Sequence, residues 1–233
     1  MKILKYVLLA FAGVGVLFGA VAAYVAATFD PNTYKPQVIQ LVKEKKQRTL
    51  KLDGDIKLKF WPSIGADLGK LALSEFKSEA EFAAVESARV SLKLMPLLSK
   101  QVIVDAIEIK NLKAAIVRGK DGKLNIADLT GGEKKADAPK ADGGAVKIDI
   151  DHVTLENAAL TYDDHQAGSK YALSKVNLKT GRIASGVPGK IDLSFLAQSD
   201  KPKLNLEAAL KTGLMFDLDK QHLVLDGMDF SAK

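Results

Sequence analysis

Few side chains in this 233-residue sequence could carry catalysis or hold a metal. Cysteine is absent, which excludes a thiol nucleophile, thiolate metal ligands and disulfide bonds. The three histidines are His152, His165 and His222, and the first two lie beside aspartates in the segments 149–152 and 163–165. Carboxylates together with imidazole bind many divalent metals, so these two clusters are where metal-dependent chemistry could occur.

Neither cluster has the setting that such chemistry needs. Asp149 and Asp151 have the same parity on one predicted strand and are expected to point to water, and residues 163–168 have the composition of a solvated turn. The sequence also contains no Gly-rich phosphate loop, zinc-ligand spacing or serine elbow. We therefore name no catalytic residue and no metal ligand, expect no cofactor, and predict that the protein is not an enzyme.

Most of the sequence after Thr49 predicts β-strands. Apolar residues occupy every second position and alternate with Lys, Asp, Glu or Ser, which predicts strands with one apolar and one polar face. The main alternating segments are 50–60, 82–94, 102–109, 146–162, 171–178, 191–197 and 204–218. The apolar face could be covered by a second sheet, as in a sandwich, or left open as a groove, and the alternation does not distinguish these two architectures.

The beginning of the chain predicts a membrane anchor. Residues 6–28 contain no charged side chain, and as a helix they would span roughly 34 Å, against about 30 Å for the hydrocarbon core. This apolar run is longer than that of a usual signal peptide, although residues 25–27 could form a cleavage site, and a buried soluble helix is a third alternative. Lys2 and Lys5 favour a cytoplasmic N-terminus and an exported body.

A short amphipathic helix is predicted over 36–47, because Val38, Ile39, Leu41 and Val42 lie on one face at helical spacing. This helix could lie on the membrane surface or against the end of the β-sheet. Cations close to the anchor could attract anionic headgroups, and the candidate membrane-surface contacts are Lys43, Lys45, Lys46 and Arg48. The remaining positive charge, part of a net +6, is scattered, which argues against a nucleic-acid surface.

We predict four segments: an anchor over 1–28, a helix and first β-unit over 29–130, a flexible linker over 131–145, and a second β-unit over 146–233. The linker consists mainly of Gly, Lys, Asp, Ala and Pro without apolar periodicity, so it lacks the residues that would order it.

A weak repeat relates the two β-units. Residues 107–111 resemble residues 153–157 at a shift of 46, and Gly122 corresponds to Gly168 at the same shift. The similarity indicates stacked copies of one strand and turn unit, or the recurrence of Asn turns in any meander.

Several short motifs, taken together and in order, resemble the AsmA family over essentially the whole chain. They are Phe29-Asp30-Pro31-Asn32, Leu52-Asp53-Gly54-Asp55-Ile56, Trp61-Pro62-Ser63-Ile64-Gly65, residues 90–98, Arg118 with Asp121-Gly122 and Asn125, Leu155-Glu156-Asn157-Ala158, and Asn177-Leu178-Lys179-Thr180-Gly181. None of these motifs is catalytic. Members of the family are usually much longer, so this chain is similar to the N-terminal section of such a protein or to a short relative.

The resemblance implies a location and a role. It implies an inner-membrane anchor in a Gram-negative bacterium, and a periplasmic body in which a long curved β-sheet folds into an apolar groove. The role implied is outer-membrane homeostasis through phospholipid movement, or alternatively a non-enzymatic scaffold that affects outer-membrane protein assembly. The expected partners are membrane phospholipid, the inner membrane and other envelope proteins that pair with an exposed strand edge, but not nucleic acid.

The fold class that follows is mainly β: a transmembrane helix, a short amphipathic helix, and a curved antiparallel β-sheet that forms an open apolar groove. Six residues on apolar strand faces are the candidates for the groove lining: Leu92, Leu94, Leu193, Phe195, Leu204 and Leu206. Sheltering about eight methylenes there would contribute roughly 6 kcal/mol, enough to hold part of an acyl chain reversibly.

Overall fold

The structure, a computed structural model, describes residues 30–60, 63–98, 103–130, 149–217 and 222–233. The predicted anchor and the predicted linker lie outside these ranges. None of the helices within the described ranges is both long and apolar enough to span a bilayer.

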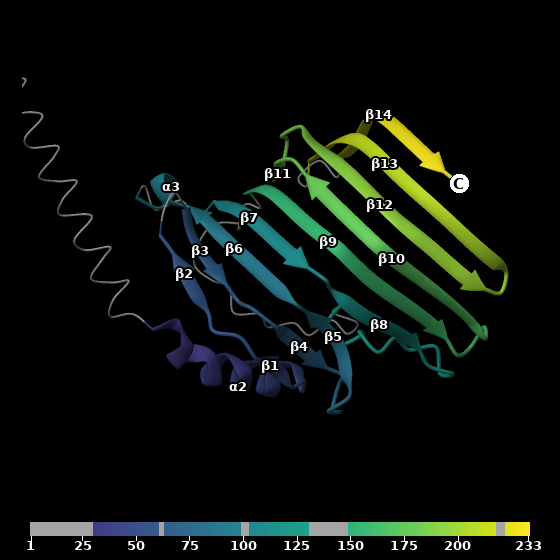
Figure 1. Cartoon of the computed structure of the whole chain (residues 1–233), viewed down its shortest axis with the longest axis horizontal. Coiled ribbons are helices and arrows are strands. Elements are labelled where there is room, and N and C mark those ends of the chain that lie inside the picture. The colour runs from purple at the N-terminus through teal and green to yellow at the C-terminus, as the bar shows by residue number, and fades with distance from the viewer. Residues whose placement is uncertain (1–29, 61–62, 99–102, 131–148, 218–221) are drawn as a thin grey trace, which may run out of the picture.

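Three short helices accompany the sheet: η1 (Pro31–Tyr34), α2 (Lys35–Lys46) and α3 (Leu94–Leu98). The Asp30 carboxylate caps η1 by accepting a 2.9 Å hydrogen bond from the backbone N–H of Asn32, and Pro31 occupies the first turn, where no donor is needed. Gln47 caps the C-terminal end of α2, and its φ of 53° is left-handed. The predicted helix over 36–47 is therefore confirmed, and it lies against β1 at one end of the sheet (Figure 1).

The strands form a single 14-stranded sheet. Their bounds are β1 Leu50–Leu52, β2 Lys57–Lys59, β3 Ser63–Asp67, β4 Leu71–Ser74, β5 Glu81–Val85, β6 Ser87–Lys93, β7 Val104–Lys110, β8 Lys113–Arg118, β9 Asp149–Asp164, β10 Ser169–Thr180, β11 Ile183–Ala184, β12 Gly189–Asp200, β13 Lys203–Asp217 and β14 His222–Ala232. The two predicted β-units thus lie in one sheet, because β7 and β8 pair with β9.

β9 is the strand on which the two halves meet. Its first half pairs with β7 and its second half with β8, both in parallel, while its other edge pairs antiparallel with β10 and β11. The prediction of an antiparallel sheet is wrong at this point, although the other strand pairs are antiparallel. β9 begins beside the start of β7, with Ile150 opposite Val104, and ends beside the end of β8, with Asp164 opposite Arg118, so it runs in the same direction as both strands.

A line of backbone irregularities, which we call the crease, crosses the sheet. Along it the chain passes from β1 to β2 at Gly54, from β3 to β4 at Gly69, and from β7 to β8 at Asn111, and β9 has its own irregularity at Asn157. The segment 50–60, predicted as one strand, is divided there into β1 and β2. A Cβ atom on Gly54 would lie 3.1 Å from the Cα of Gly69, so the two glycines permit this close approach.

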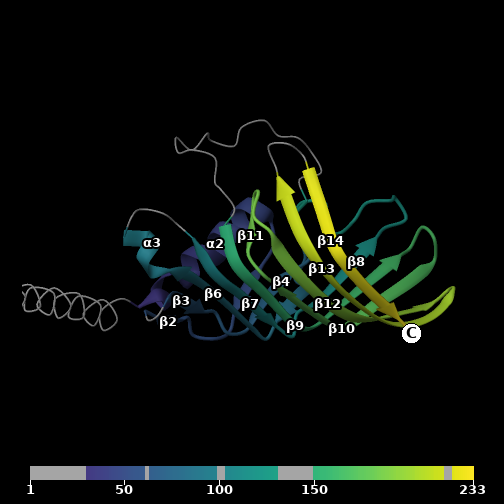
Figure 2. The same ribbon diagram turned by 90° about the horizontal axis from the view of Figure 1, so that it is seen from above.

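The sheet curls without closing (Figure 2), with β13 and β14 rising on one side. Its two ends remain separate, since β1 and β14 do not pair with each other. Within the described residues no second sheet covers it, and the buried apolar side chains are mostly small: Ala106, Ala158, Val176, Ala184 and Ala208. The described part of the chain is therefore a single curled layer rather than a sandwich.

Candidate functional site: the apolar face of the sheet

Cross-strand register gathers large apolar side chains on one face of the sheet, which we call the apolar face. Residues directly opposite each other in neighbouring strands point to the same side. One row crosses seven strands through Ala88, Ile109, Leu155, Leu178, Leu193, Leu210 and Phe230. A second row crosses eight strands through Leu50, Leu73, Ala83, Ala114, Leu160, Leu173, Ala197 and Leu206.

The opposite face of the same strands is charged. Between β10 and β14 one row contains Lys179, Asp192, Lys211 and Asp229, and the Nζ of Lys211 lies 3.7 Å from the carboxylate of Asp192. The members of this row are exposed, whereas Leu178, Leu193 and Leu210 beside them are half-buried. Large apolar side chains therefore occupy one face of these strands and charged side chains the other.

The structure brings four of the six groove candidates together. Leu193 and Phe195 on β12 lie opposite Leu210 and Ala208 of β13, and Leu206 and Leu204 lie opposite Ala197 and Ser199. All four therefore belong to one apolar patch on β12 and β13.

The other two groove candidates lie elsewhere. Leu92 on β6 faces Ile64 and Val104, far across the sheet from β12 but on the same apolar face. The prediction that Leu94 continues the strand is wrong, because Leu94 is the first residue of α3. Pro96 follows two residues later, and its missing N–H is tolerated in the first turn of a helix but not in a central ladder.

Of the four predicted membrane-surface cations, Lys43, Lys45 and Lys46 are exposed in the last turn of α2. Arg48 contradicts its prediction, since only 1% of it is exposed. Its guanidinium donates to the Asp128 carboxylate at 2.8 and 2.7 Å and to the carbonyl of Ser74 at 2.8 Å, and it stacks over Phe82 at 5.0 Å. Arg48 therefore connects the end of β4, at Ser74, to Asp128 in the segment after β8, and its guanidinium is not free to contact lipid headgroups.

The aspartates of the two candidate metal clusters form ion pairs instead. Arg182 donates to both carboxylate oxygens of Asp149 at 2.9 and 2.7 Å, and Lys93 contacts Asp151 at 2.9 Å. The hydrogen bonds from Arg182, which contribute most, hold the pKa of Asp149 below its ordinary value. In the described part of the chain no three His, Asp or Glu side chains gather as metal ligands would.

Asp164 differs from its prediction as a solvated turn residue, because it is buried. Its carboxylate accepts hydrogen bonds from the backbone N–H groups of Ala167 and Gln166 at 3.0 and 2.9 Å, and Arg118 contacts it at 3.3 Å. These donors, Ala167 first, lower the pKa of Asp164. The carboxylate thus fixes the turn after β9, a role that composition alone did not indicate.

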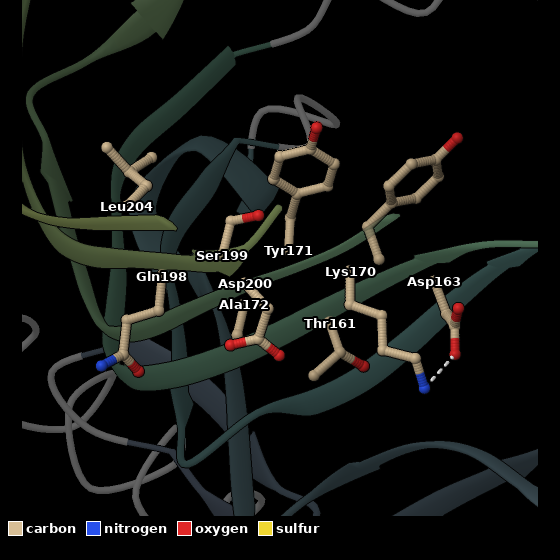
Figure 3. Close-up of a pocket in the computed structure, with 10 residues that line it drawn as sticks. Thr161, Asp163, Lys170, Tyr171, Ala172, Gln198, Ser199, Asp200 and Leu204 are labelled. Atoms are coloured by element: carbon tan, nitrogen blue, oxygen red, sulfur yellow. Dashed lines mark ion pairs between the residues drawn. The ribbon is translucent and has the colours of Figure 1, made fainter. Parts of the chain in front are cut away.

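A depression of about 530 Å³ at the far ends of β9, β10 and β12 was not predicted. Figure 3 shows Tyr171 and Leu204 on one side of these strands and Gln198, Lys170 and Asp163 on the other, where Lys170 and Asp163 form a 2.8 Å ion pair. On the apolar side, Tyr162 and Tyr171 lie with ring centroids 6.3 Å apart. The two tyrosines therefore form an amphipathic end to the apolar face, which only the register of β9 and β10 reveals.

Comparison with known proteins agrees with this architecture. The family model described as the AsmA family matches residues 1–227. The chain belongs to the AsmA family. A curated relative, Protein AsmA of Escherichia coli (strain K12), is 23% identical over 184 residues, which cover 71% of this chain and 30% of the relative. The matched region thus spans less than a third of that relative's length.

The motifs that carried the resemblance to the AsmA family have structural roles. Asn125 accepts a 2.9 Å hydrogen bond from the backbone N–H of Val117 and donates at 2.8 Å to the carbonyl of Ala115. The hydroxyl of Thr180 accepts a 2.9 Å hydrogen bond from the backbone N–H of Val153. These side chains support β8 and β9 and therefore the curl of the sheet.

Proposed function

We propose that this AsmA family protein binds the acyl chains of membrane phospholipids on its apolar face and thereby contributes to outer-membrane homeostasis. The observation that supports the proposal is the two apolar rows, which cross the curled sheet without a second layer on them in the described residues. With strands about 4.8 Å apart, a row across seven strands extends for roughly 29 Å. An acyl chain spans half of the ~30 Å hydrocarbon core, so the face is long enough for one.

The amino-acid composition of the apolar face suits the binding of acyl chains without catalysis. Its side chains are mainly Leu, Ile, Ala and Val, which shelter methylenes for ~0.8 kcal/mol each. The polar headgroup would remain near the ends of the strands, where Tyr162 and Tyr171 combine an aromatic ring with a hydroxyl. The protein is thus proposed to be a carrier or conduit rather than an enzyme.

In the same proposal, residues 6–28 anchor the protein in the inner membrane and the sheet lies in the periplasm. Association of the AsmA family with the envelope supports this location. Lys43, Lys45 and Lys46 would then lie close to anionic headgroups, each contributing about 1 kcal/mol. Arg48 is omitted from this set because its guanidinium is already paired.

Native mass spectrometry of residues 29–233 purified from a bacterial periplasm tests the proposal. We expect a mass increment equal to one or more phospholipids, released by organic extraction and identified by their acyl chains. Protein that carries no lipid, and that takes none from phospholipid vesicles after incubation, would contradict lipid binding. It would leave the scaffold role in outer-membrane protein assembly as the alternative.

A further inference from the structure

α2 carries two apolar stripes on different sides, and only one of them faces the sheet. The inner stripe, which is half-buried where α2 lies against β1, consists of Ile39 and Val42. A second set, which we call the outer stripe, consists of Tyr34, Val38 and Leu41, and these residues are 49%, 42% and 55% exposed. Residues spaced by three and four lie on one side of a helix, and a shift of one residue turns by about 100°. The outer stripe therefore points about a quarter turn away from β1.

Hydrogen bonds fix α2 to the sheet at both of its ends. At the beginning of the helix, the Nζ of Lys35 donates to the carbonyl of Gly54 at 2.6 Å. Just after its end, the buried guanidinium of Arg48 donates to the carboxylate of Asp128. The helix cannot rotate to bury the outer stripe against β1 without breaking these bonds, so the exposure of the outer stripe is a property of the fold.

The last turn of α2 is basic. It contains the exposed residues Lys43, Lys45 and Lys46, and Glu44 is the only carboxylate in the sequence of the helix. Lys45 follows Leu41 by four residues and so continues the outer stripe. The methylenes of such a lysine can lie along apolar surface while its ammonium reaches an anionic headgroup. An apolar stripe that ends among lysines is therefore complementary to the surface of an anionic bilayer.

The sequence places α2 close to the proposed anchor. The uncharged run over 6–28 ends six residues before Tyr34, and six residues reach at most about 22 Å. The headgroup region extends about 5 to 8 Å beyond the hydrocarbon core on each side of a bilayer. If residues 6–28 cross the membrane, the outer stripe therefore begins within reach of the headgroups.

We infer that α2 lies flat in the headgroup region of the inner membrane, with Tyr34, Val38 and Leu41 inserted at the boundary of the acyl chains and the lysines of its last turn at anionic headgroups. This inference rests on the anchor in the proposed function and adds a second attachment to the bilayer. An anchor alone would leave the sheet free to turn above the membrane. Because α2 is fixed to the sheet, its contact with the bilayer sets the orientation of the sheet and of the apolar face.

Engineered cysteines test the inference, because the chain has none of its own. Leu41→Cys and Gln40→Cys variants of the full chain are labelled with an environment-sensitive fluorophore and reconstituted into vesicles of equal parts phosphatidylglycerol and phosphatidylcholine. Gln40 adjoins Leu41 but lies on the polar side of α2, where its side chain donates to Glu44 at 2.8 Å. We expect a blue shift and quenching by spin-labelled acyl chains for the Leu41 probe, and neither for the Gln40 probe.

The composition of the vesicles tests the lysines. Each lysine near an anionic surface should change the ratio of docked to undocked helix by about fivefold. Quenching of the Leu41 probe should therefore fall in vesicles of phosphatidylcholine alone, and also when Lys43, Lys45 and Lys46 are all replaced by Gln. Quenching that neither change reduces would overturn the attraction of α2 to anionic headgroups.

Failure of this inference is distinguishable from failure of the proposed function. A chain that does not float with the vesicles would contradict the anchor and this inference together. A chain that floats while its Leu41 probe stays in water, or while both probes are quenched equally, would overturn this inference alone. A blue shift that spin-labelled lipid does not quench would assign the outer stripe to a protein partner, such as a second copy, and would also overturn it. None of these readouts measures phospholipid bound to the apolar face.

Discussion

Asn157 donates a 2.7 Å hydrogen bond from its Nδ2 to the Oδ1 of Asn111, and both residues have a left-handed φ of 52°. They are 46 residues apart, which is the shift of the weak repeat in the sequence. β7 and β8 pair with β9 at the same offset, as Ile107 with Val153 and Ala114 with Leu160. The repeat is therefore two similar bent strands stacked side by side, and the paired asparagines form the crease between their halves.

The conformation of Asn157 predicts unequal effects of two substitutions. Asn157→Gly keeps the left-handed backbone accessible and loses only the side-chain hydrogen bond to Asn111, so we expect a loss of about 1 kcal/mol in the free energy of unfolding. Asn157→Val loses the same bond and also strains the backbone, for a further loss of about 1 to 3 kcal/mol. Denaturant unfolding of both variants measures the difference. Equal stability would show that the backbone relaxes at the crease.

The burial of Arg48 predicts a large loss of stability when it is truncated. Arg48→Ala would leave the Asp128 carboxylate and the carbonyl of Ser74 without their donors, so we expect a loss of about 3 to 5 kcal/mol. Arg48→Lys should recover little of it, because an ammonium cannot reproduce the bidentate geometry. Lys46→Ala, at an exposed position nearby, is the control and should change stability by less than about 0.5 kcal/mol. Comparable melting of the Arg48→Ala and Lys46→Ala variants would contradict the network.

The ion pair between Arg48 and Asp128 predicts that the stability of the protein depends on pH in the acid range. The hydrogen bonds from Arg48 hold the pKa of Asp128 below its ordinary value of 3.8. Since the folded state binds this proton less tightly than the unfolded state, the stabilisation is present above about pH 3.8 and is lost as pH falls through the folded pKa. Asp128→Asn should therefore reduce the dependence of the melting temperature on pH below about pH 4, measured by circular dichroism. An unchanged dependence would assign the acid sensitivity to other carboxylates, such as Asp67 beside Arg89.

Local patterns predicted the strands, α2 and the apolar patch of Leu193, Phe195, Leu204 and Leu206, because alternation and helical periodicity depend on neighbours in the sequence. These local patterns gave wrong predictions where residues far apart in the sequence determine burial or strand direction. Arg48 looks like one more cation after a basic helix, and only its contact with Asp128, 80 residues later, shows that it is buried. The parallel pairing of β7 with β9 was equally hidden, since the repeat gave the offset but not the direction in which the two copies run.

The apolar face predicts that one new charge can abolish lipid binding while the fold survives. Leu193 lies on this face in a single layer and is half-buried, so the carboxylate of Leu193→Asp can remain in contact with water. The loss of apolar burial should reduce stability by roughly 2 to 3 kcal/mol, whereas an unpaired charge in a closed core would unfold the protein. We expect a cooperative melt at a lower temperature and a loss of bound phospholipid. Leu206→Asp, in the second apolar row, should behave in the same way.

Ser194→Asp provides the matched control, because Ser194 adjoins Leu193 on β12 but lies on the polar face opposite Ala209. It adds the same charge to the same strand, but on the face away from the two apolar rows. The lipid content should therefore stay at the level of the unmodified protein. Thermal melting and phospholipid mass spectrometry on the same preparations measure both effects. Lipid retained in folded Leu193→Asp and Leu206→Asp variants would exclude this face as the binding surface. Equal loss in the Ser194→Asp variant would assign the effect to net charge.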